Sequence, residues 1–517
     1  MTREELRLMI GQHLVCGFAG TEISEEFRRA VSHHKIANVI LFARNIESKE
    51  QLMKLTADIQ KLVRSECHTD ALICVDQEGG MVTRLSSDFT NIPGAMALSA
   101  TGKSRNAYDA GFLTATELRS CGVNVDFAPT LDVNSNPDNP VIGVRSFSDD
   151  PSVVSEFGVA MARGLQEGGV MACGKHFPGH GDTHIDSHLS LPTVTGDISA
   201  HLQPFKAAIN NKIEGIMTSH ILFPELEDRN LPATMSRTIL TDLLKKEMGF
   251  EGLVFSDCME MKAIADNWGT VDGALMALRA GVDIVCISHH VNLGVEVVEL
   301  LEKAIQDGTF GMTEFMELKK STQKILRQKK RLAEVPVKPS SIIGTKEHTR
   351  LNRELHEQSI TLVNDAPFTL GANPLFIGPR PFRATNVSDD GKQRHFGAAL
   401  ADLMGGDHLL VGDNPTEDEI GEVVKQAKNY QSVVLGTYNG HLHRGQLTLA
   451  NALREVTQVC VFALRNPYDL SSLNPSIRSY AAWSYTPMTF EAIARVLKGE
   501  IQATGLLPVH LGGRTDA

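Results

Sequence analysis

Residues 170–192 read VMACGKHFPGHGDTHIDSHLSLP, and the rest of the chain is interpreted outward from this stretch. The run at residues 170–174 is short and apolar, as a buried strand is, and it leads directly into Lys175 and His176. The prolines and glycines of FPGHG, residues 177–181, exclude a regular helix immediately afterwards. Parallel α/β proteins keep their chemistry in such polar loops at the carboxyl ends of strands. We therefore expect a functional loop here.

The loop is unusually rich in groups that titrate near neutral pH. It contains His176, His180, His184 and His188 together with Asp182 and Asp186. Three interpretations are open: a solvated surface loop, a metal site with His and Asp ligands, or an acid/base site built on one His–Asp pair. A solvated loop has little reason to gather so many such groups, and we favour the acid/base site.

Short β-like runs alternate with helical segments through the first two thirds of the chain. The β-like runs are Leu14–Phe18, Ala37–Phe42, Ala71–Val75, Val123–Phe127, Val170–Lys175, Gly215–Ser219, Gly252–Ser256 and Val282–Ile287. Helical segments between them include Ser48–Val63, Ser104–Ser120, Val153–Glu167, Ser199–Asn211 and Arg237–Glu247, and a helix over 300–331 follows. Eight such units over about 300 residues predict an α/β fold of the TIM type, a (β/α)8 barrel. A doubly wound sheet is the alternative, because the pattern does not show closure.

A change of composition marks the end of this unit. The segment AEVPVKPSSIIG, residues 333–344, has two prolines and two serines and is typical of a linker. We expect a barrel domain over residues 1–335, a linker over 336–346 and a smaller α/β sandwich domain over 347–517. Four or five parallel strands are expected in that sandwich, among them Pro374–Gly378, Leu409–Gly412, Val433–Gly436 and Val459–Leu464.

Composition narrows the class of protein. The chain has 517 residues and a formal net charge of -12, which disfavours a general nucleic-acid binder. No apolar run is long enough for a membrane span, and the N-terminal segment has no apolar signal region. The eight cysteines are scattered, with no CxxC pair, as buried thiols of a reduced protein are. We expect a cytoplasmic monomer or homodimer that binds neither nucleic acid nor membrane.

Polar residues follow five of the predicted barrel strands. They are Asp76 after the third strand, Asp126 in the fourth, Lys175 and His176 at the fifth, Ser219 and His220 at the sixth, and Asp257 at the seventh. In a barrel these ends surround one pocket. Carboxylates and cationic donors suit the paired hydroxyls of a sugar, and glycosyl transfer needs a carboxylate at the anomeric carbon and an acid for the leaving oxygen. Asp257 fits the first role and His188 beside Asp186 fits the second.

The chain has no GxxxxGK[ST] or GxGxxG segment, and we expect no cofactor and no metal.

These residues also carry a family resemblance. KHFPGHGDTHIDSH, VDQEGG and SDCMEMKA resemble glycoside hydrolase family 3, and more narrowly its bacterial β-N-acetylhexosaminidase branch, the NagZ type. VVLGTYNGHLHRGQ and ALRNPYDL are similar to the C-terminal α/β sandwich of that family. The resemblance implies a retaining, exo-acting β-N-acetylglucosaminidase that works through a covalent glycosyl-enzyme. It also implies terminal N-acetylglucosamine on cell-wall fragments as the substrate, as in peptidoglycan recycling.

The resemblance assigns roles to matching positions. Asp257 is the expected nucleophile, and His188 the acid/base with Asp186 behind it. The positions expected to contact N-acetylglucosamine are Asp76, Arg84, Arg145, Lys175 and His176. Two positions depart from the family pattern, which has Arg in place of Met81 and Asp in place of Cys258. His441 and His443 either face the active site or lie in an exposed interdomain loop, and we favour the exposed loop.

Several other functions stay open at this point. A phosphorylase is one, because a histidine repels incoming phosphate less than a carboxylate does. A broad β-glucosidase of the same family, a metal-dependent hydrolase and a non-catalytic sugar-binding protein are the others.

Overall fold

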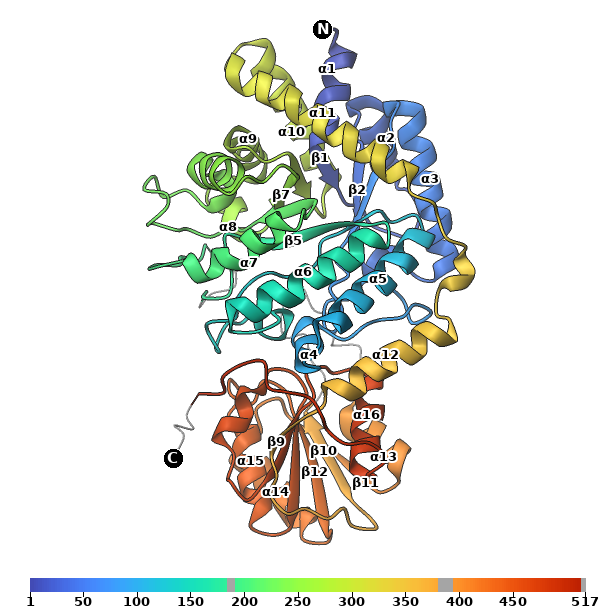
Figure 1. Cartoon of the computed structure of the whole chain (residues 1–517), viewed down its shortest axis with the longest axis vertical. Coiled ribbons are helices and arrows are strands. Elements are labelled where there is room, and N and C mark those ends of the chain that lie inside the picture. The colour runs from blue at the N-terminus through green and yellow to red at the C-terminus, as the bar shows by residue number, and fades with distance from the viewer. Residues whose placement is uncertain (184–190, 380–393, 513–517) are drawn as a thin grey trace.

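The first of two units is a closed barrel of eight parallel strands. The computed structural model describes residues 1–183, 191–379 and 394–512, and in Figure 1 the barrel lies above a smaller second unit. The strands follow one another in chain order, and β8 is hydrogen-bonded back to β1, where Leu14 pairs with Val285 and Cys16 with Ile287. The predicted barrel is confirmed, and this closure excludes the doubly wound alternative. The strands are β1 (Leu14–Cys16), β2 (Asn38–Leu41), β3 (Leu72–Val75), β4 (Val125–Asp126), β5 (Met171–Phe177), β6 (Gly215–Thr218), β7 (Leu253–Cys258) and β8 (Ile284–Ile287).

Side chains that point inward from the strands fill the barrel. One buried cluster contains Val15, Ile40, Leu72, Val125, Met171, Leu253 and Ile284, one from each of seven strands. The rings of Phe127 and Phe255 meet edge to face across it, with centroids 5.3 Å apart. All eight cysteines are free thiols and seven are buried, which agrees with the expectation of unpaired interior cysteines. The barrel is therefore a packed core, and only its rims offer space for a site.

Helices surround the barrel. They are α1 (Arg3–Ile10), α2 (Glu25–His34), α3 (Lys49–Cys67), α4 (Ala95–Ala100), α5 (Ser104–Ser120), α6 (Pro151–Glu167), α7 (Ser199–Asn210), the π-helix η5 (Thr238–Glu247), α8 (Lys262–Ala265), α9 (Thr270–Ala280), α10 (Val291–Gln306) and α11 (Met312–Glu334). The helix expected over 300–331 is wrong as a single element. It is broken where Gly308 and Gly311 have φ of +80° and +60°, values that side chains with a Cβ disfavour. No helix in the described parts of the chain combines the length and apolar character of a membrane span.

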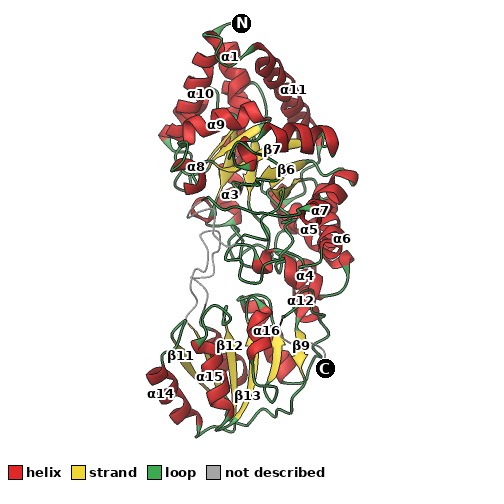
Figure 2. Ribbon diagram, turned by 90° about the vertical axis from the view of Figure 1, so that its left-hand side faces the viewer, coloured by secondary structure: helices red, strands yellow, loops and turns green. Residues whose placement is uncertain are grey.

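The second unit is a six-stranded sheet with helices on its faces (Figure 2). The strand order is β11-β10-β12-β13-β14-β9. Its strands are β9 (Thr361–Asn364), β10 (Leu375–Pro379), β11 (Asp407–Val411), β12 (Ser432–Thr437), β13 (Gln458–Ala463) and β14 (Arg478–Ala481), and its helices are α12 (Lys346–Ser359), α13 (Phe396–Met404), α14 (Glu417–Ala427), α15 (Gly445–Arg454) and α16 (Pro487–Leu497). The expectation of four or five parallel strands is confirmed, since β11, β10, β12, β13 and β14 are parallel, and the sheet has one further strand, β9, which pairs antiparallel with β14 at the edge. Both strands are only four residues long and lack the apolar runs that identified the others.

The two units share a hydrophobic core at the mouth of the barrel. Met81, Val82, Met96 and Val144, from barrel loops and α4, are buried with Leu435, Val461 and Trp483 of the second unit. Figure 1 shows α4 and α12 at this junction. The C-terminal segment also returns to the barrel, where Leu506 N donates to Ala100 O at 2.7 Å. The loops at this rim are thus held between the barrel and the second sheet. The domain limits given above remain a prediction.

A buried lysine lies at the opposite end of the barrel. Lys329 of α11 is 2 % exposed, and its ammonium donates to Gln12 Oε1 at 2.7 Å and to Ala37 O at 3.3 Å. Burial lowers the pKa of Lys329 from 10.5 to about 7, and neighbouring Asp70, Cys67 and Cys74 do not offset this.

This lysine predicts how stability depends on pH. Between about pH 7 and pH 10 the unfolded chain holds a proton on Lys329 that the folded protein has released, so the free energy of unfolding should rise with pH. Lys329→Met should be more stable than wild type at neutral pH, and the difference should shrink as pH increases. Urea unfolding across this range measures the effect. Lys330→Met, on the exposed neighbour, is the control and should retain the wild-type slope. Equal slopes in wild type and Lys329→Met would contradict the prediction.

Candidate functional site

A buried cluster of two cations and two carboxylates forms the floor of the barrel mouth. Lys175 Nζ lies 2.7 Å from Asp76 Oδ1 and 2.6 Å from Glu78 Oε1. Arg145 makes a bidentate pair with Glu78, with Nε–Oε2 2.9 Å and Nη2–Oε1 2.7 Å. Lys175, Arg145 and Glu78 are 2 %, 5 % and 6 % exposed. Three predicted site residues are thus brought together, because Lys175 pairs directly with Asp76 and shares Glu78 with Arg145.

The charges in this cluster stabilise one another. Burial alone would raise the pKa of Glu78, but the adjacent Arg145 and Lys175 outweigh it and hold that pKa well below its usual range. Burial alone would lower the pKa of Lys175, and Asp76 and Glu78 raise it instead. Asp126, which the sequence placed at this rim, is fully buried in the floor, and its Oδ1 accepts from Gln77 N at 2.9 Å. Burial raises the pKa of Asp126 well above its usual value.

A further buried carboxylate, Asp132, organises the histidine loop. Asp132 Oδ1 accepts from His176 N at 3.1 Å and from His180 N at 2.7 Å, and Asp132 Oδ2 lies 2.7 Å from His176 Nδ1. An ionised carboxylate only accepts, so His176 Nδ1 carries the proton and the ring orientation is fixed. Burial lowers the pKa of His180 to about 4, which leaves that ring neutral near pH 7. His176 is therefore held in place by Asp132 beside Lys175.

The loop also approaches the backbone of its neighbour very closely. A Cβ on Gly181 would lie 1.5 Å from Val133 O, so only glycine fits there. Asn139 Nδ2 donates to His180 O at 2.9 Å and to Gly181 O at 3.1 Å. These contacts fix the loop as far as Thr183. The predicted catalytic pair, His188 and Asp186, lies outside the described residues, as does His184.

Asp257 stands at the carboxyl end of β7, half-buried at the same rim. Its Oδ1 accepts from Cys258 N at 2.7 Å. The carbonyl of Cys258 accepts from His220 Nε2 at 3.0 Å, and His220 Nδ1 lies 2.8 Å from Thr234 Oγ1. His220 is fully buried, so this contact anchors the backbone beside Asp257. Cys258, one of the departures from the family pattern, lies partly exposed at the rim.

Arg84 lies beside an aromatic pair on the β2 and β8 side of the rim. Its backbone N–H donates to Gln77 Oε1 at 2.9 Å, and its guanidinium lies 5.8 Å from the centroid of the Phe42 ring. Phe42 stacks on His289 with ring centroids 5.4 Å apart. Arg84 is thus placed at the same rim as Asp257 and Lys175, on a different side.

The second domain contacts this rim directly. Asn134 Nδ2 donates to Tyr468 Oη at 2.6 Å, and Val144 N donates to Asn466 Oδ1 at 3.0 Å. His441 is 10 % exposed, pairs with Asp469 Oδ1 at 3.0 Å and packs edge-on against Tyr468. The interpretation of His441 as part of an exposed loop is therefore wrong. Hydrogen bonding to a fully buried carboxylate holds it inside the domain, near the barrel loops.

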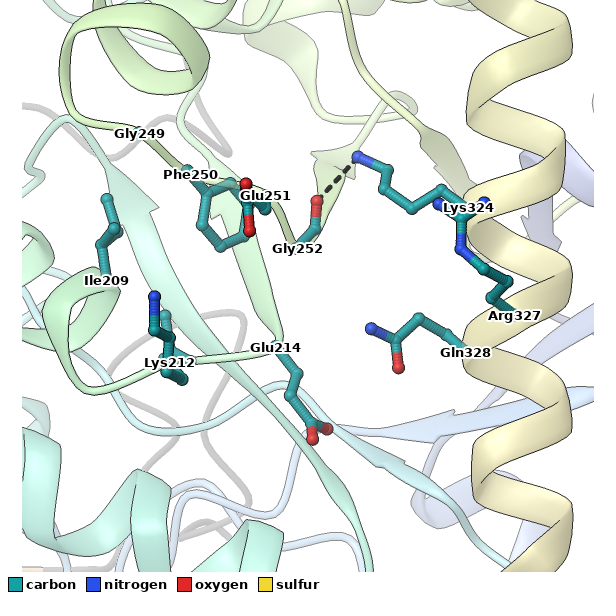
Figure 3. A pocket seen from close by; sticks show the side chains of 11 residues that line it. Ile209, Lys212, Glu214, Gly249, Phe250, Glu251, Gly252, Lys324, Arg327 and Gln328 are labelled. Carbon is teal, nitrogen blue, oxygen red and sulfur yellow. Dashed lines mark hydrogen bonds between the residues drawn. The ribbon is translucent and has the colours of Figure 1, made fainter.

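A hollow at the other end of the barrel is separate from this site. It has a volume of about 650 Å³ and lies beside Glu214, Gly252, Lys324 and Arg327. Figure 3 shows Lys324 donating to Gly252 O, at 2.7 Å. Glu214 and Gly252 precede β6 and β7, so the hollow opens at the amino ends of the strands. None of the predicted site residues that the structure describes lines it.

Sequence reasoning missed several residues that build the site. Glu78 lies within VDQEGG, but only Asp76 of that segment was assigned a role. Asp132, Asn139 and His220 were also without a role, since their importance depends on which backbone groups they reach. For Asp132 the sequence did offer a signal, because this carboxylate lies six residues after Asp126, shortly beyond the predicted fourth strand.

The ion cluster generates a test of Glu78. Glu78→Gln leaves Lys175 and Arg145 with Asp76 as their only carboxylate in the cluster. Removing one member of a buried ion network costs about 3 kcal/mol or more, so we expect a lower free energy of unfolding and a lower kcat/KM. Urea unfolding and steady-state kinetics measure both. Glu25→Gln, in the exposed Glu25–Arg29 pair, is the control and should cost less than about 1 kcal/mol. A Glu78→Gln protein that matches wild type in both would show the cluster to be dispensable.

Comparison with known proteins agrees with this geometry. The model of the glycosyl hydrolase family 3 N-terminal domain matches residues 5–327. "Beta-hexosaminidase A" of Pseudoalteromonas piscicida is 35 % identical, over 96 % of this chain and 92 % of its own length. "Beta-hexosaminidase" of Nitrosomonas eutropha is 39 % identical, over 56 % of this chain and 84 % of its own length. The structure of a family 3 β-N-acetylglucosaminidase from Paenibacillus sp. superposes with a TM-score of 0.91, at 35 % identity and 99 % coverage of both chains. This chain belongs to glycoside hydrolase family 3 and is a glycoside hydrolase.

Proposed function

We propose that the protein is a retaining, exo-acting β-N-acetylglucosaminidase that releases terminal N-acetylglucosamine. The observation that carries the proposal is a carboxylate, Asp257, on the same barrel rim as a buried floor of paired charges. Support also comes from the names of the relatives, which are β-hexosaminidases and a β-N-acetylglucosaminidase.

The charged floor is suited to the hydroxyl groups of one sugar ring. The ammonium of Lys175 has three donors, and its contacts with Asp76 and Glu78 use two. The third can donate to a sugar hydroxyl, while Asp76, whose side chain is 17 % exposed, can accept from the adjacent one. Arg145, Arg84 and His176 are the further proposed contacts with the ring and its 2-acetamido group. A site that ends in a closed floor accepts a chain end, which fits exo action.

The proposed reaction has two displacements. The Asp257 carboxylate attacks the anomeric carbon while the bond to the leaving oxygen breaks, and His188 gives that oxygen a proton. The product is an ester between the sugar and Asp257. Neutral His188 then takes a proton from water, the water oxygen attacks the same carbon, and the ester bond breaks. Asp186 supports the imidazolium of His188, which favours a pKa near the working pH. The roles of His188 and Asp186 rest on the family resemblance.

We propose cell-wall fragments as the natural substrate class. This assignment rests on the resemblance to the β-N-acetylhexosaminidase branch.

A panel of p-nitrophenyl β-glycosides tests the activity. If the site recognises the 2-acetamido group, the N-acetylglucosaminide should exceed the glucoside by more than about tenfold in kcat/KM, or roughly 1.4 kcal/mol. A xyloside, which lacks the 6-hydroxymethyl group, is the third member. Equal kcat/KM for N-acetylglucosaminide and glucoside would overturn the proposal in favour of a broad β-glucosidase.

Azide rescue tests the two catalytic roles separately. In Asp257→Ala no ester forms, and azide in the vacated space should attack from the face opposite the leaving group, giving the α-glycosyl azide. In His188→Ala the ester forms from an activated aryl glycoside but lacks a base, and azide should displace Asp257 to give the β-azide. Each variant should lose most of its turnover without azide. The anomer is read by NMR of the product. Asp257→Ala with more than about a tenth of wild-type turnover, or His188→Ala without rescue, would show that the role lies elsewhere.

A further inference from the structure

Three neighbouring parallel strands of the second sheet end against the barrel mouth. They are β12, β13 and β14, and beyond their ends lie Tyr438, Arg465 and Ser484. In this sheet β10 lies between β11 and β12. The chain therefore passes from β10 to β11 on one side of β10, and then crosses to β12 on its other side. Ligands of open α/β sheets bind outside the carboxyl ends of strands near such a reversal. This edge is therefore a place where a ligand site is expected, and it faces the barrel loops.

Arg465 is buried at this edge without an anionic partner. It is 3 % exposed, and in the described parts of the chain it forms no ion pair. Its Nη2 contacts Met81 Sδ at 3.3 Å, and its guanidinium lies 5.7 Å from the centroid of the Tyr438 ring. Its Nε has no hydrogen-bond acceptor within residues 1–183, 191–379 and 394–512. A buried cation without a hydrogen-bonded counter-charge costs several kcal/mol. Arginine does not relieve that cost by losing its proton.

Two other buried arginines have oxygen acceptors of the kind that Arg465 lacks in the described parts of the chain. Arg145, which is 5 % exposed, has the carboxylate of Glu78. Arg119, which is 7 % exposed, donates from Nη2 to the carbonyls of Leu332 and Val335 at 2.6 and 2.9 Å. Arg465 has a sulfur atom, a poor acceptor, in the corresponding place. Within the described ranges, Arg465 thus lacks the carboxylate or carbonyl acceptor that the other two arginines have.

Further unpaired donors lie at the same edge. The hydroxyls of Thr437, at the end of β12, and Ser484, just beyond β14, are buried and have no hydrogen-bond partner among the residues that the structure describes. Ser484 also lines a cavity of about 10 Å³ together with Glu78, Met81 and Arg145. A cavity of that size holds about one water molecule. Two hydroxyls and a guanidinium are donors that suit an oxyanion.

This edge of the sheet contacts the two barrel loops that carry the charged floor. Met81, which touches Arg465, is in the same loop as Glu78. Asn466, the next residue after Arg465, accepts from Val144 N at 3.0 Å, and Val144 precedes Arg145. Arg465 thus stands directly behind the two loops that carry Glu78 and Arg145. A group bound by Arg465 would lie next to the proposed sugar site.

We propose that Arg465 is the centre of an oxyanion-binding site that receives a carboxylate or phosphate group of the reaction partners. The inference rests on the proposed glycosidase function. One source of the oxyanion is an acidic group on the sugar that leaves. The other is inorganic phosphate, whose oxygen attacks the anomeric carbon of the glycosyl ester in place of water, so that the bond to Asp257 breaks and a glycosyl phosphate is released.

Matched substrates separate the two sources. The first pair is N-acetylglucosaminyl-N-acetylmuramic acid and its neutral carboxyl methylamide, which differ in one charge. The second comparison is p-nitrophenyl N-acetylglucosaminide with and without sodium phosphate, at ionic strength kept constant with sodium chloride. The proteins are wild type, Arg465→Gln, Arg465→Lys and the control Arg119→Gln. Thermal unfolding of each variant records whether it is folded.

For an acidic leaving sugar, we expect wild type to favour the acid over the amide by about tenfold or more, mainly through KM. Arg465→Gln should reduce that ratio to near one, Arg465→Lys should keep part of it, and Arg119→Gln should keep all of it. For phosphate, wild type should turn over faster and form a glycosyl phosphate, and Arg465→Gln should lose this response. Either result supports the site and names its source.

Two results overturn the proposal. One is a wild-type enzyme that cleaves the acid and the amide equally well and whose turnover does not change with phosphate. The other is a folded Arg465→Gln with the wild-type ratio and phosphate response, which would leave Arg465 a packing residue. Cleavage of the p-nitrophenyl N-acetylglucosaminide in simple buffer reports separately on the glycosidase function, so failure of the oxyanion site and failure of the proposed function give different results.

Discussion

The barrel mouth depends on the buried pairing of Lys175 and Arg145 with Asp76 and Glu78. Glu78 is the shared member, because it contacts both cations. Lys175 comes from β5, the carboxylates follow β3, and Arg145 lies in the long connection after β4. Burying any one of these charges alone would cost several kcal/mol, so each is tolerated only while the others are in place. The cluster therefore fixes three separate segments of the chain relative to one another before any substrate is present.

Asp132 extends the same principle to a loop without regular structure. One carboxylate accepts two backbone N–H groups and one imidazole of the segment from His176 to His180. Buried backbone donors need partners, and here a side chain supplies them where no strand does. The close approach of Gly181 to Val133 O then brings the loop against the connection that carries Arg145. Proposed sugar contacts and the start of the histidine loop are thus parts of one hydrogen-bonded unit.

The sequence predicted what depends on local pattern. Eight apolar runs identified the barrel strands, because a strand buried on both faces reads as a continuous apolar run. The same rule failed for β9 and β14, which are four residues long and lie toward an edge of their sheet. It also joined α10 and α11, since the helical pattern continues across the two glycines that separate them. Glu78, Asp132 and His220 could not be assigned roles from local pattern, because their contacts with Arg145, His176 and Cys258 each span at least 38 residues of sequence. Asp76, Arg145 and Lys175 were proposed through family resemblance, and in the structure Lys175 pairs with Asp76 and shares Glu78 with Arg145.

The two ends of the barrel show how differently a buried cation can be accommodated. Lys329 has neutral acceptors, and its pKa of about 7 lets it lose much of its charge in the folded protein. Arg465 has no such route, because guanidinium stays protonated. Met81, Val144 and Trp483 belong to the apolar cluster that the second domain shares with the barrel, and Arg465 contacts one of them, Met81. A charge that is permanent, buried and without a carboxylate in the described chain is costly for a purely structural interface. Its place behind the loops of Glu78 and Arg145 supports the proposal that the second domain takes part in binding the reaction partners as well as in covering the barrel mouth.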